Sequence, residues 1–267
     1  MRIARFAHQS GMSFGAVDGE LGAGPEAMTV AEIEGHPFGQ IRFTGQRWAL
    51  ADVRLLSPIL PSKVIGVGRN YAEHAAEHGA QVPAEPLIFL KPSTAVIGPR
   101  DAIRLPPQST RVEHEAELAV VIGPPGARRA DRAAAERAVF GYTCANDVTA
   151  RDLQRSDGQW TRAKGFDSFC PLGPWITTGI DVGDLEVRCE VGRTPDDMEV
   201  RQLGRTRDMV FDVPTLVSYV SHVMTLLPGD VILTGTPAGV GPLAPGDLVS
   251  VRVEGIGELT NPAVALE

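Results

Sequence analysis

Three glutamates stand at alternate positions in one short segment of the chain: Glu113, Glu115 and Glu117. If this segment is a β-strand, alternate side chains point to the same side, so the three carboxylates share one face. Two like charges about 4 Å apart repel by roughly 4 kcal/mol at an effective dielectric constant near 20. Because the segment continues into the apolar run 118–122, the carboxylates call for a bound cation or a proton.

Oxygen ligands of this kind are typical of hard divalent cations such as Mg²⁺ and Mn²⁺, whereas Zn²⁺ prefers histidine and cysteine. Asp147 follows another apolar stretch and precedes a polar turn with Arg151 and Gln154, so it is a candidate third carboxylate ligand. Two plainer interpretations stay open on spacing alone. The glutamates also fit a solvated acidic edge strand, and Asp147 also fits a helix cap or a loop aspartate.

Lysine is scarce and occurs only at Lys63, Lys91 and Lys164, whereas arginine is abundant. In a chain that uses arginine for its surface cations, a remaining lysine favours a position where a compact point charge is needed. Lys164 stands beside Gly165 among bulky residues, where a partly buried ammonium group would bind a carboxylate or an enolate oxygen. A lysine that spreads its stem over the surface fits the same pattern.

His74 and Glu77 are three residues apart in a segment with helical character, so they share one face of the helix. A carboxylate beside an imidazole is a candidate general base for activating water, although an ordinary exposed helix pair has the same spacing. The loop 234–241 is rich in glycine, as anion-binding loops are, but it lacks the Gly-Lys-Ser/Thr ending of a P-loop. Nucleotide binding is therefore weakly supported.

These candidates lie in the second of two regions of the chain. Residues 1–57 contain short β segments between glycine-rich stretches and no cluster of chemically active residues. Two proline-containing steps follow at 57–58 and 60–61 and mark a boundary. We expect a small β-rich amino-terminal domain at 1–57 and a catalytic domain at 58–267.

In the second region, apolar runs and turn residues predict strands at 63–68, 87–90, 111–122, 231–234 and 248–253. Helical spacing and capping residues predict helices at 70–79, 130–140 and 213–227, the last capped by Asp212. Strands and helices do not alternate regularly, which argues against a Rossmann or barrel α/β fold. The pattern predicts an α+β, β-rich fold.

The composition of the 267 residues is that of an ordinary globular protein, with 43% hydrophobic and 22% charged residues. No apolar run approaches the roughly 20 residues that span a bilayer, and the first residues lack the apolar stretch of a signal peptide. Three cysteines without ligand-like spacing argue against a disulfide framework and a zinc site. The net charge of −8, with no basic stripe, argues against a nucleic-acid partner. We expect a cytoplasmic protein that binds neither nucleic acid nor a membrane.

Taken together and in order, the segments from about Ser62 to Val264 resemble the fumarylacetoacetate hydrolase family. The matching motifs are GVGRNYAEHAAEHG, FLKPSTAVIG, HEAELAVVIG, NDVTARDLQ, DGQWTRAKGFDSFCPLGPWI, LPGDVILTGTPAGVG and VEGIGELTNP. The chain is most similar to a bacterial branch of 2-hydroxyhepta-2,4-diene-1,7-dioate isomerases, which acylpyruvate hydrolases and oxaloacetate decarboxylases share. The resemblance implies a mixed β-sandwich roll with a small amino-terminal domain, and a homodimer.

The resemblance also implies a metal site and a set of residues around the substrate. It implies that Glu115, Glu117 and Asp147 bind one Mg²⁺ or Mn²⁺ per subunit, and that Glu113 is not a ligand. Lys164 matches a family lysine near the substrate. The resemblance implies a catalytic dyad on a mobile lid, formed by His74 and Glu77. It also implies that the oxo-acid end of the substrate is lined by Arg151, Gln154 and Thr236.

The residues and the resemblance together predict a metal-dependent enzyme that acts on a small 2-oxo dicarboxylic acid of the acylpyruvate type through a metal-stabilised enolate. The expected reaction is C–C bond hydrolysis or decarboxylation, as in an acylpyruvate hydrolase or an oxaloacetate decarboxylase. Isomerisation of 2-hydroxyhepta-2,4-diene-1,7-dioate in aromatic-compound catabolism is the alternative. A non-catalytic protein that holds a metal or an oxo acid is a more remote alternative. The three reactions share one site, so the sequence leaves the physiological substrate open.

Overall fold

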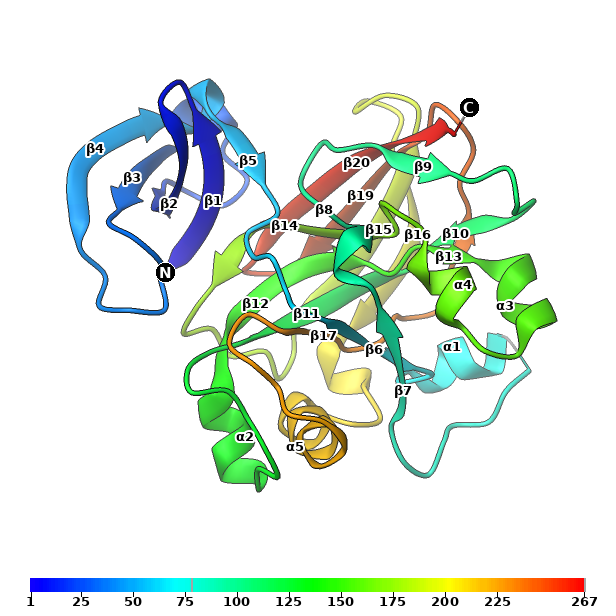
Figure 1. Ribbon diagram of the computed structural model, residues 1–267. Helices are drawn as coiled ribbons and strands as arrows, with labels where there is room; N and C mark the ends of the chain where they lie inside the picture. The colour runs from blue at the N-terminus through cyan, green and yellow to red at the C-terminus, as the bar shows by residue number, and fades with distance from the viewer. Residues whose placement is uncertain (78, 267) are drawn as a thin grey trace.

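The computed structural model describes residues 1–77 and 79–266 and contains one large mixed sheet that runs through both regions of the chain (Figure 1). Across this sheet the strands follow the order β4 (Phe43–Ala49), β3 (Thr29–Ile33), β2 (Gly11–Asp18), β1 (Arg2–His8), β14 (Cys170–Thr177), β12 (Val139–Asn146), β11 (Ala116–Ile122), β17 (Val231–Leu233), β6 (Val64–Gly68) and β7 (Leu87–Lys91). Two short strands lie off this path: β5 (Arg54–Leu56) pairs with β1, and β8 (Val96–Ile97) pairs with β14.

A second sheet packs against the centre of the large one, and a third sheet has three short strands. The second sheet has the order β16 (Glu199–Arg205), β15 (Glu186–Gly192), β19 (Leu248–Val253), β20 (Gly257–Ala265) and β9 (Ile103–Leu105). The third has the order β13 (Thr149–Ala150), β10 (Val112–His114) and β18 (Gly241–Pro242). Buried residues of the two larger sheets meet in one core, as Leu118 of β11 and Val251 of β19 illustrate. The predicted α+β, β-rich roll is therefore confirmed.

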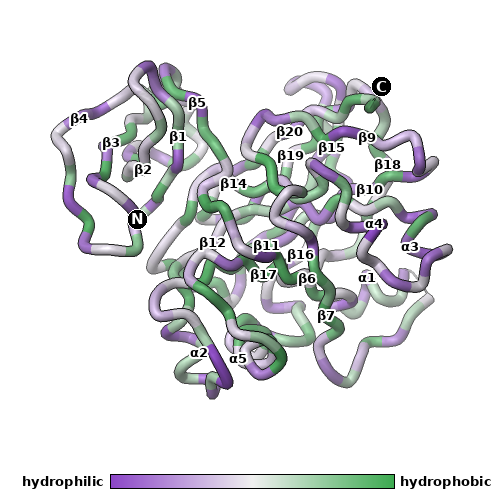
Figure 2. The backbone as a smooth tube through the Cα atoms, viewed as in Figure 1, coloured by the Kyte–Doolittle hydropathy of each residue, from purple (hydrophilic) through white to green (hydrophobic). Residues whose placement is uncertain are grey.

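The helices are short and lie around the sheets. Five α-helices are described: α1 (Ala72–Glu77), α2 (Arg132–Ala138), α3 (Arg151–Asp157), α4 (Thr161–Gly165) and α5 (Val213–Val223). Single 3-10 turns are η1 (Pro25–Ala27), η2 (Leu50–Asp52), η3 (Ser93–Ala95) and η4 (Thr206–Asp208). Figure 2 shows the largely apolar α5 and, beside it, α2, in which charged residues stand among alanines. No helix in the described ranges is long and apolar enough to cross a membrane.

Two predicted helices end earlier in the structure than expected. The helix predicted at 213–227 begins after Asp212, whose side chain caps the Thr215 amide, but it ends at Val223. Its continuation is replaced by backbone pairing of Leu226 with Ala127. The helix predicted at 130–140 ends at Ala138, because the β-branched and aromatic residues that follow are taken up by strand β12.

The amino-terminal strands form a lobe of their own, shown in blue in Figure 1. They enclose a small core that includes Phe6 of β1 and Val30 of β3. The lobe joins the rest of the sheet through antiparallel pairing of β1 with β14, at Arg2 with Thr177 and Ile3 with Ile176. The division of the chain into 1–57 and 58–267 stays a prediction.

Candidate metal centre and active site

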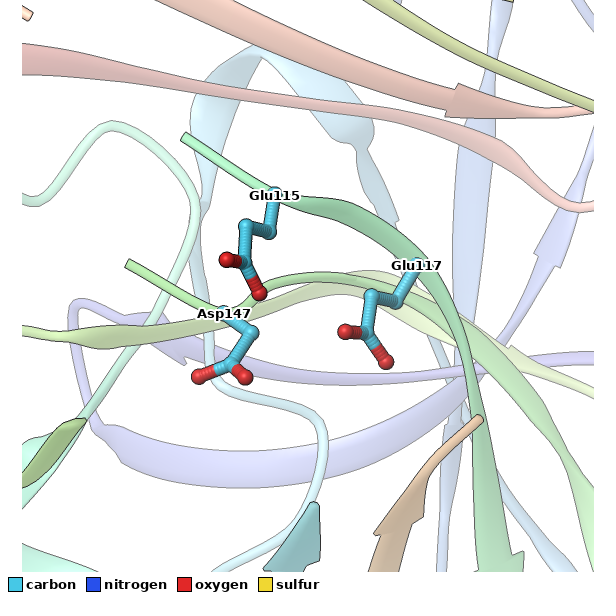
Figure 3. A group of neighbouring side chains, drawn as sticks. All are labelled: Glu115, Glu117 and Asp147. Carbon is cyan, nitrogen blue, oxygen red and sulfur yellow. The ribbon is translucent and has the colours of Figure 1, made fainter. Parts of the chain in front are cut away.

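The register of two neighbouring strands brings three carboxylates together. In the β11–β12 pair, Glu117 lies opposite Ala145, and one step further along the Asp147 amide donates to the Glu115 carbonyl at 2.8 Å. Asn146 fixes the same point, because its Oδ1 accepts from the Glu115 amide at 2.9 Å. One oxygen each of Glu115, Glu117 and Asp147 lies within 4.8 Å of the others, and all three side chains are buried (Figure 3).

Glu113 does not belong to this group. The segment predicted as one strand at 111–122 breaks at Glu115, and its first part, β10, pairs with β13 and β18 in a different sheet. The Glu113 carboxylate there accepts from Arg111 Nε at 2.5 Å and from Arg151 Nε at 2.6 Å. The even spacing alone therefore misplaces Glu113, because alternation holds only within a continuous strand.

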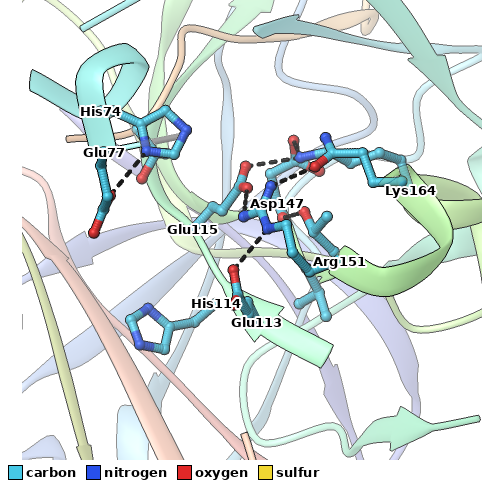
Figure 4. Close-up of polar contacts among 12 residues, drawn as sticks. His74, Glu77, Glu113, His114, Glu115, Asp147, Arg151 and Lys164 are labelled. Atoms are coloured by element: carbon cyan, nitrogen blue, oxygen red, sulfur yellow. Dashed lines mark hydrogen bonds and ion pairs between the residues drawn. The ribbon is translucent and has the colours of Figure 1, made fainter. Parts of the chain in front are cut away.

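Buried cations surround two of the three clustered carboxylates (Figure 4). Lys164 Nζ donates to Glu115 Oε2 at 2.7 Å and to Asp147 Oδ2 at 2.6 Å. Lys91 Nζ donates to Asp147 Oδ1 at 2.6 Å, and Arg151 Nη2 donates to Glu115 Oε1. Charge-assisted hydrogen bonds of this kind hold the side chains in fixed positions.

Glu117 is the carboxylate that these cations leave uncompensated. It accepts a hydrogen bond from the Gly235 amide at 2.6 Å, and within residues 1–77 and 79–266 it forms no ion pair. Burial raises the pKa of Glu117 well above its usual range, and the charges of Asp147 and Glu115 raise it further. For Glu115, burial acts in the same direction, but Lys164 and Arg151 outweigh it and hold the pKa below its usual range.

The donor set fits a divalent cation. Three buried carboxylates supply oxygen ligands only, which is the chemistry that Mg²⁺ and Mn²⁺ prefer. A cation at this point would stabilise the ionised form of Glu117, which burial and the charges of Asp147 and Glu115 otherwise disfavour. The cluster can therefore hold a metal ion.

The predicted dyad lies on the opposite side of the cluster from Lys164, on α1 (Figure 4). His74 Nδ1 is 3.5 Å from Glu77 Oε2, and the Glu77 carboxylate faces the Gly239 amide at 3.3 Å. Burial lowers the pKa of His74 below 6.5, in spite of the nearby Glu115 charge. The imidazole is therefore neutral at pH 7 and has the protonation state that a general base needs.

A cavity of about 60 Å³ connects these groups and has room for a few water molecules. It is lined by Val67, Gly68, Arg69, His74, Phe89, Glu115, Glu117, Asp147, Arg151, Gln154, Trp160, Lys164 and Thr236. Every predicted site residue lines this cavity except Glu77, which reaches it through His74. Their individual roles stay predictions.

The three residues predicted at the oxo-acid end are held by the protein itself. Gln154 Oε1 accepts from Arg151 Nη1 at 2.6 Å. The Thr236 hydroxyl donates to the Ala116 carbonyl at 2.8 Å and accepts from Gln202 Nε2 at 2.7 Å. Their side chains are thus positioned before any substrate arrives.

Two buried residues that support the site were not predicted from the sequence. Lys91 holds Asp147, and only the scarcity of lysine hinted at a special position for it. Gln202 of β16 accepts from the Ala116 amide at 3.0 Å and from His114 Nδ1 at 2.9 Å, while its own amide donates to the Thr236 loop. Nothing in the local sequence marks this glutamine, since its partners are more than thirty residues away along the chain.

The fold and the site define a β-rich protein with a buried carboxylate cluster that can hold a metal, faced by an imidazole and a lysine. The family model described as fumarylacetoacetate (FAA) hydrolase C-terminal matches residues 63–264. The model described as Rv2993c-like, N-terminal matches residues 1–58. The chain belongs to the fumarylacetoacetate hydrolase family, as its motifs indicated.

Among curated proteins, Rv2993c of Mycobacterium tuberculosis is 55% identical over 272 residues, with 99% of this chain and 98% of that protein covered. The human mitochondrial oxaloacetate tautomerase FAHD2A is 44% identical over 228 residues, with 80% of this chain and 70% of that protein covered. The second relative is an enzyme that acts on a 2-oxo dicarboxylic acid.

Two solved structures bear on the site. The 2-hydroxyhepta-2,4-diene-1,7-dioate isomerase from Mycobacterium marinum is 54% identical, with a TM-score of 0.90 and coverage of 99% of this chain and 98% of that one. The maleylpyruvate hydrolase from Sphingobium sp. SYK-6, in complex with manganese(II) and pyruvate, is 34% identical, with a TM-score of 0.77 and full coverage of both chains. Three of these four relatives are named as enzymes, each with a different reaction: tautomerisation, isomerisation and hydrolysis.

Proposed function

We propose that this protein is a divalent-metal enzyme that acts on small 2-oxo dicarboxylic acids through an enolate. Its reaction is C–C bond hydrolysis of an acylpyruvate or decarboxylation of oxaloacetate. The observation that carries the proposal is one cavity of about 60 Å³ in which a buried carboxylate cluster, the imidazole of His74 and the ammonium group of Lys164 meet. The protein is further proposed to work as a cytoplasmic homodimer.

Glu115, Glu117 and Asp147 would hold one Mg²⁺ or Mn²⁺ per subunit. When bound, such an ion supplies Lewis-acid stabilisation of the negative charge that develops on the oxygens of a 2-oxo acid. The complex of the maleylpyruvate hydrolase with manganese and pyruvate supports both the ion and the ligand class. Lys164 and Arg151 add fixed positive charge beside the same carboxylates, where it is little screened by water.

His74 and Glu77 supply the proton-transfer step. The neutral imidazole accepts a proton from water, which then attacks the distal carbonyl of an acylpyruvate and releases the enolate of pyruvate. Glu77 stabilises the imidazolium that forms, and the Gly239 amide holds the Glu77 carboxylate in place. Decarboxylation needs no attacking water, because CO₂ leaves and the same kind of enolate remains.

Isomerisation or tautomerisation is the second candidate, favoured by two of the relatives. The isomerase from M. marinum is 54% identical, and the human oxaloacetate tautomerase is 44% identical. In these reactions the imidazole would move a proton between carbon and oxygen of the substrate, and no C–C bond would break.

A spectrophotometric panel with Mg²⁺ or Mn²⁺ separates these reactions. The substrates are oxaloacetate, acetylpyruvate, fumarylpyruvate and a 2-hydroxyhepta-2,4-diene-1,7-dioate. We expect metal-dependent consumption of oxaloacetate or of an acylpyruvate, with pyruvate as a product. Turnover of the dienoate alone, or keto–enol interconversion of oxaloacetate without pyruvate formation, would support the second candidate. Binding of pyruvate or oxalate without any turnover would identify a non-catalytic binding protein.

A further inference from the structure

Arg69 has an unusual backbone conformation at the edge of the candidate active site. It lies between β6 and α1 with φ of 59°, in the left-handed region that residues other than glycine rarely adopt. Glycine would adopt this conformation without steric conflict. A non-glycine residue held in such a conformation beside a functional cavity suggests that its side chain has a use there.

Arg69 is also the one cationic side chain of this cavity that has no charged or hydrogen-bonding partner among the described residues. The cavity is lined by three cationic side chains, those of Arg69, Arg151 and Lys164. Arg151 pairs with Glu113 and Glu115, and Lys164 pairs with two clustered carboxylates. The Arg69 guanidinium forms no hydrogen bond and no ion pair with any residue in the ranges 1–77 and 79–266. It is half-buried, so it is available to a ligand in the cavity.

The pairing of charges shows which ligand would need this guanidinium. Glu113 pairs with Arg111 and Arg151, and Glu115 and Asp147 pair with Arg151, Lys164 and Lys91. A divalent cation at the cluster would compensate Glu117, so these cations and the metal are all engaged by the carboxylates of the protein or by the oxo-acid end of the substrate. A second carboxylate, at the distal end of the substrate, would need a further cation.

We propose that Arg69 binds the distal carboxylate of the substrate and makes this site selective for 2-oxo dicarboxylates over 2-oxo monocarboxylates. Guanidinium and carboxylate groups form paired, charge-assisted hydrogen bonds, which give selectivity as well as affinity. The assignment rests on the proposed function, because it takes the oxo-acid end of the substrate to lie at the carboxylate cluster.

The test is calorimetric binding of two stable ligands to the full chain loaded with Mg²⁺. 2-Oxoglutarate and 2-oxopentanoate have the same carbon chain and differ by the distal carboxylate. We expect the wild-type protein to bind 2-oxoglutarate about 10- to 100-fold more tightly, the scale of one charged hydrogen-bonded pair. Arg69→Gln should remove this preference with little change for 2-oxopentanoate, and Arg69→Lys should keep part of it.

Arg129→Gln is the matched control, because Arg129 is an exposed arginine with φ of 47° that does not line this cavity. It should keep the full preference. Equal affinity of the wild-type protein for both ligands, or a preference that survives in Arg69→Gln, would overturn the assignment and leave the proposed function standing. Failure of the Mg²⁺-loaded wild-type protein to bind either 2-oxo acid would contradict the proposed function itself, and the Arg69 assignment would fall with it.

Discussion

Replacing Glu117 with glutamine is expected to lower kcat/KM at least about 10³-fold and to weaken Mn²⁺ binding strongly, because Lewis-acid stabilisation contributes several kcal/mol to such reactions. The substitution keeps the size of the side chain and an acceptor for the Gly235 amide, but it removes one of the three proposed anionic ligands. Steady-state kinetics and equilibrium dialysis with Mn²⁺ measure both effects. Chelation of the metal from the wild-type enzyme should have the same consequence, reversed by Mg²⁺ or Mn²⁺.

The stability of the metal-free protein distinguishes this loss from misfolding. Burial and two like charges raise the pKa of Glu117 above its usual range in the metal-free folded protein. The folded state therefore loses stability as the pH rises from the pKa of Glu117 in the unfolded chain toward its higher pKa in the folded protein. Glutamine removes this penalty, so metal-free Glu117→Gln should melt at the same temperature as the metal-free wild type at pH 7, or higher. A variant that is as active as the wild type would show that Glu117 is not a ligand.

Replacing His74 with alanine is expected to lower the rate of acylpyruvate hydrolysis about 10²-fold or more, the usual scale of general-base catalysis. Decarboxylation of oxaloacetate should suffer less, because it needs no attacking water. Since burial lowers the pKa of His74 below 6.5, the base stays deprotonated at pH 7, and the acid limb of the wild-type kcat/KM profile should lie below pH 6.5. Initial rates across pH measure both predictions.

The control for this substitution is His222→Ala, at an exposed histidine near the end of α5, outside the cavity. It should leave both rates unchanged. A hydrolysis rate in His74→Ala equal to that of the wild type would remove the dyad from the mechanism.

The sequence was most informative where chemistry depends on short-range geometry. Glu115 directly precedes β11 and Glu117 is the second residue of that strand, so the alternation of side chains places both on one face. His74 and Glu77 meet because they are about one helical turn apart. Asp147 was a candidate by its position after an apolar run, but its place opposite Glu115 depends on the β11–β12 register, which single-strand spacing does not contain. The family resemblance supplied that link.

The parts that sequence reasoning missed depend on long-range packing. The strand expected at 111–122 breaks at Glu115 because its first part pairs in another sheet, and this turned Glu113 toward two arginines. Lys91 and Gln202 reach the site from β7 and β16, so their roles follow from tertiary contacts and not from neighbouring residues.

The most direct test of metal-dependent enolate formation is deuterium exchange into the methyl group of pyruvate in D₂O, followed by mass spectrometry. This exchange requires the enolate but no C–C bond cleavage, so it does not depend on which substrate the cell supplies. We predict that the Mg²⁺-loaded enzyme exchanges the methyl hydrogens at least about 10²-fold faster than the metal-free enzyme or the Mg²⁺-treated Glu117→Gln variant. Equal exchange rates in all three samples would contradict the proposal that the cluster of Glu115, Glu117 and Asp147 holds a metal that stabilises an enolate.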